Sequence, residues 1–231
     1  MLVDAGNSKD DADSVILPFL RQHGINRLDY LVLTHPHQDH VGGMPQVLRS
    51  LDVSVAVFSG EISANSTYQQ FLSIIREHNI RALQARRGKS LDLGPDVRAE
   101  ILNPPEQFFA EMNDNSVVVR VVWRDTSVLL MGDVETEAER SILESGAEIS
   151  STILKVGHHG SGTSSSAQFL DAVRPRYAVI SVGAGNDYGH PHERTLEALS
   201  RRNVATFRTD LNGTVVFVSN GTEVAVSTEK R

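Results

Sequence analysis

The 231-residue chain contains no cysteine, so it forms neither a disulfide nor a thiolate metal site. Any transition metal that it binds must therefore be held by imidazole and carboxylate groups. The chain also lacks an apolar run close to the roughly 18 residues that a membrane span needs. Work at a membrane would therefore require a missing segment or a partner. The pattern of a signal peptide, a basic stretch followed by an apolar one, is absent from the N-terminus.

The 22 basic residues are outnumbered by 29 acidic residues, so the formal net charge is −7. This balance argues against a broad basic surface for nucleic acid. It does not exclude a nucleic-acid substrate, because bound divalent cations can supply positive charge locally. The hydrophobic content of 40% and charged content of 22% are typical of a globular protein. The length favours a single domain over residues 1–231.

Apolar runs and helical spacings alternate along the chain, which predicts an α/β fold. Two hairpins, at 116–132 and 214–227, indicate sheets with antiparallel parts covered by helices rather than a purely parallel sheet. The predicted helices are 14–24, 67–79, 135–146, 165–173 and 193–203. The predicted strands are 2–4, 28–34, 53–59, 80–85, 97–102, 116–123, 127–133, 151–157, 176–183, 204–208, 213–219 and 222–227.

The stretch THPHQDHVGG at 34–43 places three histidines and an aspartate directly after an apolar run. His35 and His37 would point the same way if the strand geometry persists, with Asp39 and His40 in the turn beyond. Such a run can offer two nitrogens to one cation, and a carboxylate with a nitrogen to a second. The two glycines that follow would let the backbone bend tightly behind the ligands.

Other polar side chains also follow apolar runs. Asp133 ends LLMGD, where an ordinary turn aspartate is the alternative interpretation. The adjacent His158 and His159 end ILKVGHH, and His190 and His192 flank a proline, where they could instead cap a helix. Strands that pack together would gather these ligands at one edge of a sheet, as in many α/β sites. Together the motifs predict a two-metal hydrolytic centre.

With these motifs the chain resembles the metallo-β-lactamase superfamily, whose signature is H-x-H-x-D-H, an aspartate after an apolar strand and a later histidine. LVDAG, LTHPHQDHVGG, LLMGDVETEAE, ILKVGHHGSGTSSS, AVISVGAGNDYGHPH and FRTDLNGTV resemble the C-terminal domain of the ComEC DNA-uptake proteins. The resemblance implies a four-layer αββα sandwich. Relatives begin with earlier strands that are missing here, as expected for an incomplete gene model, a truncated chain or a fragment of a longer membrane protein.

The resemblance also implies roles for individual residues. His35 and His37 would bind one divalent cation, Zn or Mn. The ligands of the other cation would be Asp39, His40, Asp133 as the bridge, and His158 or His159. Asp4, in LVDAG, would support the site without binding metal.

We also predict which residues take part in catalysis and in substrate binding. Asp39 and Asp133 would act in catalysis, and His190 or His192 would contact the phosphate or protonate the leaving oxygen. Further side chains near the histidines are candidates for substrate binding: Ser161, Thr163, Ser164, Asn186 and Tyr188.

One histidine of the superfamily pattern is missing. Many members place a metal-binding histidine before the GD motif, but between Pro45 and Asp133 this chain has only His78, in a predicted helix. The corresponding segment offers Asn103, Asn113 and Asn115 instead. We therefore expect the first metal site to be weak, to hold manganese rather than zinc, or to form only with substrate.

The resemblance implies that the chain is a metal-dependent phosphodiesterase. It would act as a nuclease on single-stranded DNA during DNA uptake. Its partner would be the membrane channel portion of a ComEC-type protein, reached at the bacterial cytoplasmic membrane through a missing segment. Two alternatives remain open: a hydrolase of small phosphodiesters or phosphocholine esters, and a non-catalytic domain that binds nucleic acid or a partner and keeps a vestigial metal site. β-Lactam hydrolysis is the least favoured, since the fold says little about substrate.

Overall fold

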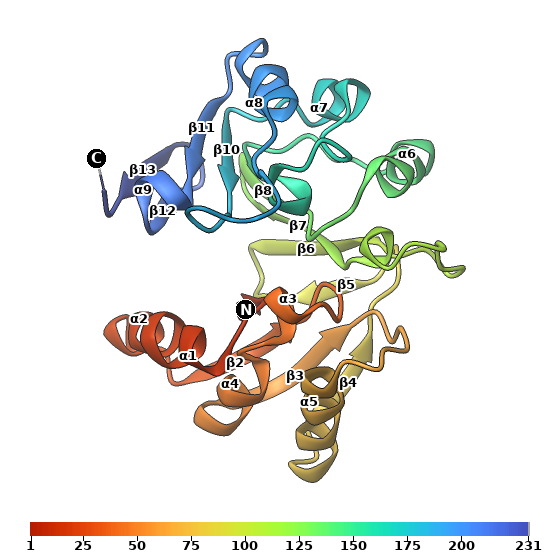
Figure 1. Ribbon diagram of the computed structural model, residues 1–231, viewed down its shortest axis with the longest axis vertical. Coiled ribbons are helices and arrows are strands. Elements are labelled where there is room, and N and C mark those ends of the chain that lie inside the picture. The colour runs from red at the N-terminus through yellow and green to blue at the C-terminus, as the bar shows by residue number, and fades with distance from the viewer. Residues whose placement is uncertain (231) are drawn as a thin grey trace. The chain divides into compact units, whose positions relative to one another are not determined.

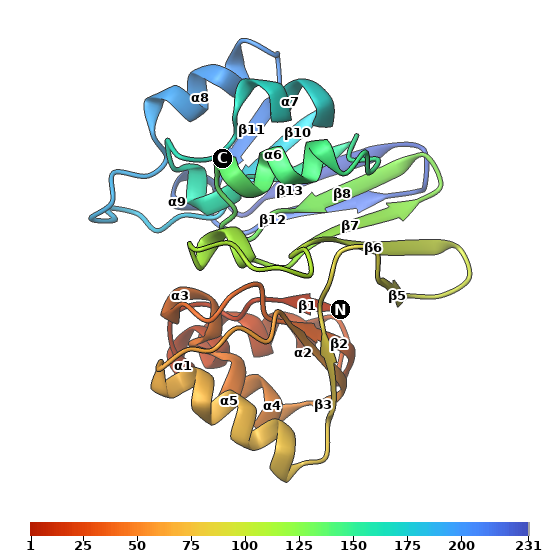
Figure 2. The same cartoon turned by 90° about the vertical axis from the view of Figure 1, so that its right-hand side faces the viewer.

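The computed structural model describes residues 1–230, which form two compact units, Met1–Arg86 and the chain from Arg87 onward (Figures 1 and 2). Each unit has its own sheet and its own hydrophobic core. The expectation of one domain over residues 1–231 stays a prediction. None of the helices in the described part of the chain combines the length and apolar character that crossing a membrane needs.

The first unit is a parallel sheet with helices packed on it. Its core joins Leu31 and Ala56 of the sheet to Met44 and Phe71 of two helices. The strands, in sheet order, are β1 (Leu2–Val3), β2 (Arg27–Val32), β3 (Asp52–Phe58) and β4 (Arg81–Gln84). The helices are α1 (Lys9–Asp11), a π-helical turn (Ala12–Ile16), α2 (Leu17–Gln22), α3 (Gln38–Val41), α4 (Met44–Ser50) and α5 (Ser66–Glu77).

Helix α5 shows why the first unit folds as it does. Its buried residues Tyr68, Phe71 and Ile75 recur at helical spacing, so one face of the helix is apolar. The side chain of Asn65 accepts hydrogen bonds from the backbone N–H groups of Thr67 and Tyr68, at 2.8 and 3.1 Å, and so caps the first turn. Apolar spacing and cap together fix where this helix begins and which face it buries.

The second unit is built on a mixed seven-stranded sheet. Adjacent strands of this sheet are antiparallel from β5 to β8 and parallel from β8 to β11. In sheet order the strands are β11 (Ala205–Arg208), β10 (Tyr177–Ile180), β9 (Ile153–Lys155), β8 (Thr126–Leu130), β7 (Val118–Trp123), β6 (Val97–Asn103) and β5 (Ser90–Asp92). A separate hairpin joins β12 (Val215–Ser219) to β13 (Val224–Thr228).

Three helices of the second unit lie together along its sheet (Figure 2). They are α6 (Thr136–Glu144), α7 (Ala167–Val173) and α8 (Glu193–Ser200), and α9 (Thr209–Asn212) is a single turn. Ile142, Phe169 and Leu199 of the three helices share a core with Leu129 and Leu154 of the strands. Short 3₁₀ turns cover Asn113–Asn115 and Gly157–Gly160. The buried faces of these helices thus pack on the strands whose ends carry the candidate site.

The mixed sheet and both hairpins confirm the predicted pattern of strands. The strand at 28–34 was predicted too long, since β2 ends at Val32 and residues 33–37 form no regular structure. Asp39 and His40 lie in helix α3 rather than in a turn. Helix α4 was not predicted, although Pro45 in its first turn is a favoured starting residue.

The N-terminus of α6 is capped by a residue that is distant in sequence. Glu135, at the cap position, makes no side-chain cap hydrogen bond of its own. Instead, the buried carboxylate of Asp114 accepts hydrogen bonds from the N–H groups of Glu135 and Ala138, at 2.8 and 3.2 Å. This contact ties the 3₁₀ turn to the helix that follows Asp133.

We expect Asp114→Ala to lower the free energy of unfolding by about 1–2 kcal/mol, the usual cost of losing an N-cap. Chemical denaturation monitored by circular dichroism measures the change. Asp96→Ala is the matched control, because Asp96 is exposed, and it should change the value by less than about 0.5 kcal/mol. Equal effects of the two substitutions would contradict the capping role.

Candidate metal-binding residues

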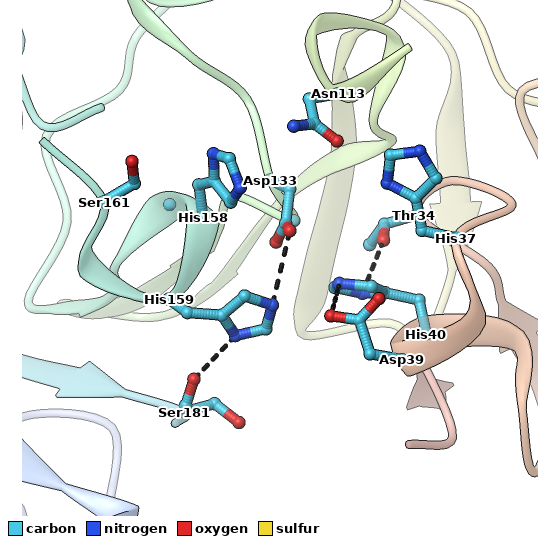
Figure 3. A network of polar contacts seen from close by, with 12 residues as sticks. Thr34, His37, Asp39, His40, Asn113, Asp133, His158, His159, Ser161 and Ser181 are labelled. Atoms are coloured by element: carbon cyan, nitrogen blue, oxygen red, sulfur yellow. Dashed lines mark hydrogen bonds and ion pairs between the residues drawn. The ribbon is translucent and has the colours of Figure 1, made fainter. Parts of the chain in front are cut away.

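In the first unit, the ring of His40 is held from one side by Asp4. The two lie 2.7 Å apart, from His40 Nδ1 to Asp4 Oδ2, so Nδ1–H donates to the carboxylate. The other nitrogen, Nε2, faces Asp39 at 3.5 Å from Oδ2 (Figure 3). The Asp4 carboxylate therefore fixes the rotation of the buried imidazole, which presents Nε2 to a second carboxylate.

Asp4 is itself anchored at the end of β2. Its carboxylate accepts hydrogen bonds from the backbone N–H and the hydroxyl of Thr34, both at 2.8 Å. Burial alone would raise the pKa of Asp4, but the charge and hydrogen bond of His40 outweigh it and lower the pKa below its usual value. Asp4 is thus an ionised acceptor that orients His40, as expected for a residue that supports a metal ligand.

His35 and His37 contact each other. Nε2 of the buried His35 lies 2.9 Å from Nδ1 of His37, a hydrogen-bond distance, and the ring centroids are 4.6 Å apart. One of these two nitrogens must carry the proton, so it cannot offer a lone pair in this arrangement. The strand geometry expected for the pair does not persist, yet the loop after β2 still brings the two rings together.

The glycines after His40 are required for a different reason from the predicted tight bend. Gly42 has an ordinary helical φ of −53°. A Cβ at Gly42 would lie 2.0 Å from the carbonyl carbon of Asn7, and one at Gly43 would lie 2.3 Å from the oxygen of Ala5. The loop after Asp4 therefore packs directly on the backbone at the end of α3.

In the second unit, Asp133 and His159 form a similar pair. Asp133 is buried beyond the end of β8, and its N–H donates to the Ser116 hydroxyl at 3.1 Å. His159 Nε2 lies 3.3 Å from Asp133 Oδ2 (Figure 3). On the other side of the ring, Nδ1 donates to the carbonyl oxygen of Ser181 at 2.7 Å. His159 thus also presents Nε2 to an aspartate.

Both histidines of the HH pair have left-handed backbone conformations. The φ angles are +46° at His158 and +52° at His159, a region that costs roughly 1–2 kcal/mol for each non-glycine residue. Hydrogen bonds from His158 N–H to Gly132 O and from Ser161 N–H to His158 O hold the turn. The consequence is that the two side chains leave the backbone in different directions.

His158 contacts Glu135 rather than Asp133. Its Nδ1 lies 2.9 Å from Oε1 of Glu135, and the same oxygen accepts a hydrogen bond from Asn113 Nδ2 at 3.2 Å. Glu135 is not among the site residues that the sequence predicts. Its one local signal is its place directly after GDV, at the start of the predicted helix 135–146.

The other two candidate asparagines shape their own loop. Asn103 Nδ2 donates to the carbonyl oxygens of Asp114 and Ser116, at 2.7 and 2.8 Å. The amide of Asn115 bonds both the N–H and the carbonyl of Phe109. Asn113, by contrast, bonds Glu135, the residue that faces His158.

The His190 ring of the GHPH segment lies against His158, and the His192 ring lies against His190. The His190 centroid is 5.5 Å from that of His158 and 5.3 Å from that of His192, and the exposed Tyr188 stacks on His190 at 5.7 Å. Burial and the neighbouring imidazoles lower the pKa of His190. Asn186 bonds the backbone of Tyr188 and His190 and so builds this loop.

Hydroxyl groups of the loop after His159 bond mainly within the loop. The Ser161 and Thr163 hydroxyls are 2.9 Å apart, and Ser164 donates to the carbonyl of Gly157 at 2.8 Å. These contacts give the loop a fixed shape. The substrate-binding roles of Ser161, Thr163, Ser164, Asn186 and Tyr188 stay predictions.

In each of the two carboxylate–imidazole pairs, the distance between the carboxylate oxygen and the imidazole nitrogen suits two ligands of one divalent metal ion. Ligand bonds of 2.0–2.2 Å at a tetrahedral angle put a nitrogen and an oxygen about 3.4 Å apart across a zinc ion. The Asp39–His40 and Asp133–His159 distances are 3.5 and 3.3 Å. Direct charge-assisted hydrogen bonds are shorter, at about 2.7–2.9 Å. The donor atoms and spacings therefore suit a zinc-like or manganese-like cation.

Comparison with known proteins agrees with this chemistry. Residues 1–184 match the model of the metallo-β-lactamase superfamily. The chain belongs to the metallo-β-lactamase superfamily. This confirms the predicted α/β fold, a hydrolase fold that binds divalent metals.

Three similar curated proteins are ComEC-type competence proteins, as the sequence motifs predicted. ComE operon protein 3 of Bacillus subtilis is 34% identical over 89% of the chain, and competence protein ComA of Neisseria gonorrhoeae is 35% identical over 89%. Recombination protein 2 of Haemophilus influenzae is 31% identical over 93%. The matched parts are 26%, 27% and 26% of these relatives, so the chain spans about a quarter of their length.

Solved structures share the fold at low sequence identity. A metal-dependent hydrolase of the β-lactamase superfamily has a TM-score of 0.55 and 14% identity, over 89% of this chain and 84% of that one. The diiron β-hydroxylase CmlA of Streptomyces venezuelae has a TM-score of 0.52 and 12% identity, over 78% of this chain and 44% of that one. Because these two proteins differ in chemistry, the fold alone does not assign a substrate.

The GHPH segment depends on a glycine of the HHG turn. Gly160 has a φ of +79°, and a Cβ there would lie 2.6 Å from the Cβ of Pro191. We expect Gly160→Ala to push His190 away from His158 and to lower the free energy of unfolding by about 2–4 kcal/mol, the sum of the clash and the backbone cost. Urea denaturation and the NMR shifts of His190 measure the two effects.

Gly189→Ala is the control for the backbone cost alone. Gly189 has a φ of +68°, and nothing lies within 4 Å of a Cβ built there. This variant should lose only about 1–2 kcal/mol. If Gly160→Ala were no more destabilised than Gly189→Ala, the packing of Pro191 on the turn would not position His190.

Proposed function

We propose that this chain is a metal-dependent phosphodiesterase, a nuclease that cleaves single-stranded DNA. The observation that carries the proposal is the repeated arrangement of Asp39 with His40 and of Asp133 with His159. In each pair the histidine Nδ1 is held at 2.7 Å by an acceptor and Nε2 faces a carboxylate. Membership of a superfamily with a metal-dependent hydrolase fold supports this assignment.

The proposed cofactors are two divalent cations, zinc or manganese. His35 and His37 are proposed for the first cation, which we expect to be weakly held because their two nitrogens bond each other at 2.9 Å. The proposed ligands of the second cation are Asp39, His40, Asp133 and His159. We choose His159 over His158, because the Nδ1 of His158 faces Glu135.

When bound, the two cations would supply Lewis acidity and an activated water for attack on phosphorus. The protein's own part is to orient the groups around them. Asp4 and the carbonyl of Ser181 hold the rings of His40 and His159. His190 and His192 are proposed to contact the phosphate, as their exposed or half-buried rings permit.

The biological context is proposed from the relatives. Two of them are named as a competence protein and a recombination protein, which supports DNA as the substrate and uptake as the process. Because the chain spans about a quarter of their length, the channel portion of a ComEC-type protein is the proposed partner. The proposed location is the bacterial cytoplasmic membrane, reached through that partner.

The purified chain, incubated with Mn²⁺ and labelled single-stranded DNA, is expected to shorten the DNA. Asp133→Asn and Asp39→Asn should each lower the rate by more than about a hundredfold, because each removes a charged metal ligand. Gel electrophoresis of the labelled strand measures the products. Asp96→Asn, an exposed aspartate outside the site, should leave the rate unchanged.

Other outcomes of this experiment would favour a different function. Uncut DNA with every divalent metal tested would rule out the nuclease. A small chromogenic diester that is cleaved much faster than DNA would favour a small-molecule phosphodiesterase. The direct His35–His37 contact gives a binding-only domain some support. Fewer than one tightly held metal per chain, with no rescue by Mn²⁺, would favour that role.

The adjacent histidines provide a matched pair of variants for metal binding. His159→Ala should weaken binding of the second cation by about tenfold to a hundredfold or more, whereas His158→Ala should leave it nearly unchanged. Competition with a chromogenic chelator measures the dissociation constants. Both residues have left-handed backbones, so the backbone effects of the two substitutions are similar. A larger loss in His158→Ala would reverse the assignment.

A further inference from the structure

A polar pocket of about 480 Å³ lies at the far end of the second unit's sheet from Asp133. Ser127, at the start of β8, lines the pocket, whereas Asp133 follows the other end of the same strand. The extended residues from Ser127 to Leu130 alone span roughly 10 Å. The pocket is therefore separate from the candidate metal ligands of this unit.

Arginines dominate the lining of this pocket. Four guanidinium groups are accompanied by two carboxylates, so the pocket carries two more positive than negative charges in a chain of net charge −7. One carboxylate, that of Glu148, already accepts a hydrogen bond from the N–H of Ser150 at 2.8 Å. The charged residues of the lining are Arg120, Arg124, Arg174, Arg176, Asp125 and Glu148.

Arg120 is the strongest argument that this pocket takes an anion. Its side chain is buried, with 6% exposed, and both Nε and Nη2 donate to the same acceptor, the carbonyl oxygen of Ser150, at 3.2 and 2.8 Å. Among residues 1–230, no carboxylate forms an ion pair with it. Buried charges in proteins are ordinarily paired, so this cation calls for an anion from solution.

Two of the other arginines occupy backbone positions that suit glycine better. The φ angles of Arg124 and Arg174 are +53° and +49°, in the left-handed region. Arg174 ends helix α7 there, a position where glycine is the usual residue. The backbone therefore gives no reason for arginine at either position, whereas a charged ligand in the pocket does.

We propose that this pocket binds a small phosphate-bearing anion, either free phosphate or the phosphate of a mononucleotide. Guanidinium groups match phosphate oxygens in pairs, and several of them can neutralise a dianion. The volume lies in the range of small-molecule sites. The inference goes beyond the proposed nuclease function and does not depend on it.

Calorimetric titration of the full chain, in the presence of a chelator, tests the proposal. The probes are inorganic phosphate, deoxyadenosine 5′-monophosphate, deoxyadenosine and a single-stranded oligonucleotide. Phosphate, the nucleotide or both should bind, and deoxyadenosine should not. If both bind equally tightly the ligand is the free ion, and if the nucleotide binds more tightly it is the nucleotide.

Two variants locate the binding. Arg174→Gly and Arg176→Gln should each weaken phosphate or nucleotide binding by about tenfold or more. Arg174→Gly suits its left-handed backbone, so the fold should be retained, as thermal denaturation will verify. Arg98→Gln, an exposed arginine outside the pocket, should bind as the unaltered chain does.

The absence of binding by phosphate and nucleotide would overturn the proposal, and so would binding that both variants retain. Binding of the oligonucleotide alone would replace a small ligand by a nucleic-acid strand and would also overturn it. The DNA cleavage rate of Arg174→Gly should equal that of the unaltered chain. The proposed nuclease and the proposed phosphate pocket can therefore fail independently.

Discussion

The hydrogen bond on Nδ1 is the constraint on which the candidate site depends. An imidazole directs one nitrogen at a metal only if the other nitrogen fixes the tautomer and the rotation of the ring. His40 satisfies this through Asp4 and His159 through the carbonyl of Ser181, each at 2.7 Å. One acceptor is charged and the other is neutral. His40 therefore gains more basicity from its partner than His159 does.

The backbone that positions His159 is strained, and contacts in the surrounding structure must offset this cost. Consecutive left-handed residues at His158 and His159 are unfavourable for the isolated backbone. The following loop is fixed by Glu139, a buried carboxylate that accepts hydrogen bonds from the N–H groups of Ser165 and Ser166. Burial raises the pKa of Glu139, while these hydrogen bonds partly offset that effect. Helix α6 thus stabilises the turn through a polar contact as well as through its apolar face.

Sequence reasoning predicted the strands, the long helices and the residue types of the site, because apolar periodicity and the clustering of His and Asp are local signals. It did not predict that Asp114 caps α6 or that Glu135 contacts His158, since both contacts join segments whose approach depends on tertiary packing. It gave Gly42 the wrong reason, because the close approach of Asn7 is invisible in a local pattern. The metal roles of the site residues remain predictions.

Net charge was the least informative part of the sequence, because charge acts through its distribution. A chain of net charge −7 still gathers four arginines around one pocket, from strand β7, the turn that follows it and the segment after α7. Within the second unit, strand β8 joins this positive end to the end that carries Asp133. A rigid strand that separates the two groups by several residues keeps an anion at one end from competing for cations at the other. Substitutions at the arginines should therefore alter phosphate recognition without altering the metal ligands.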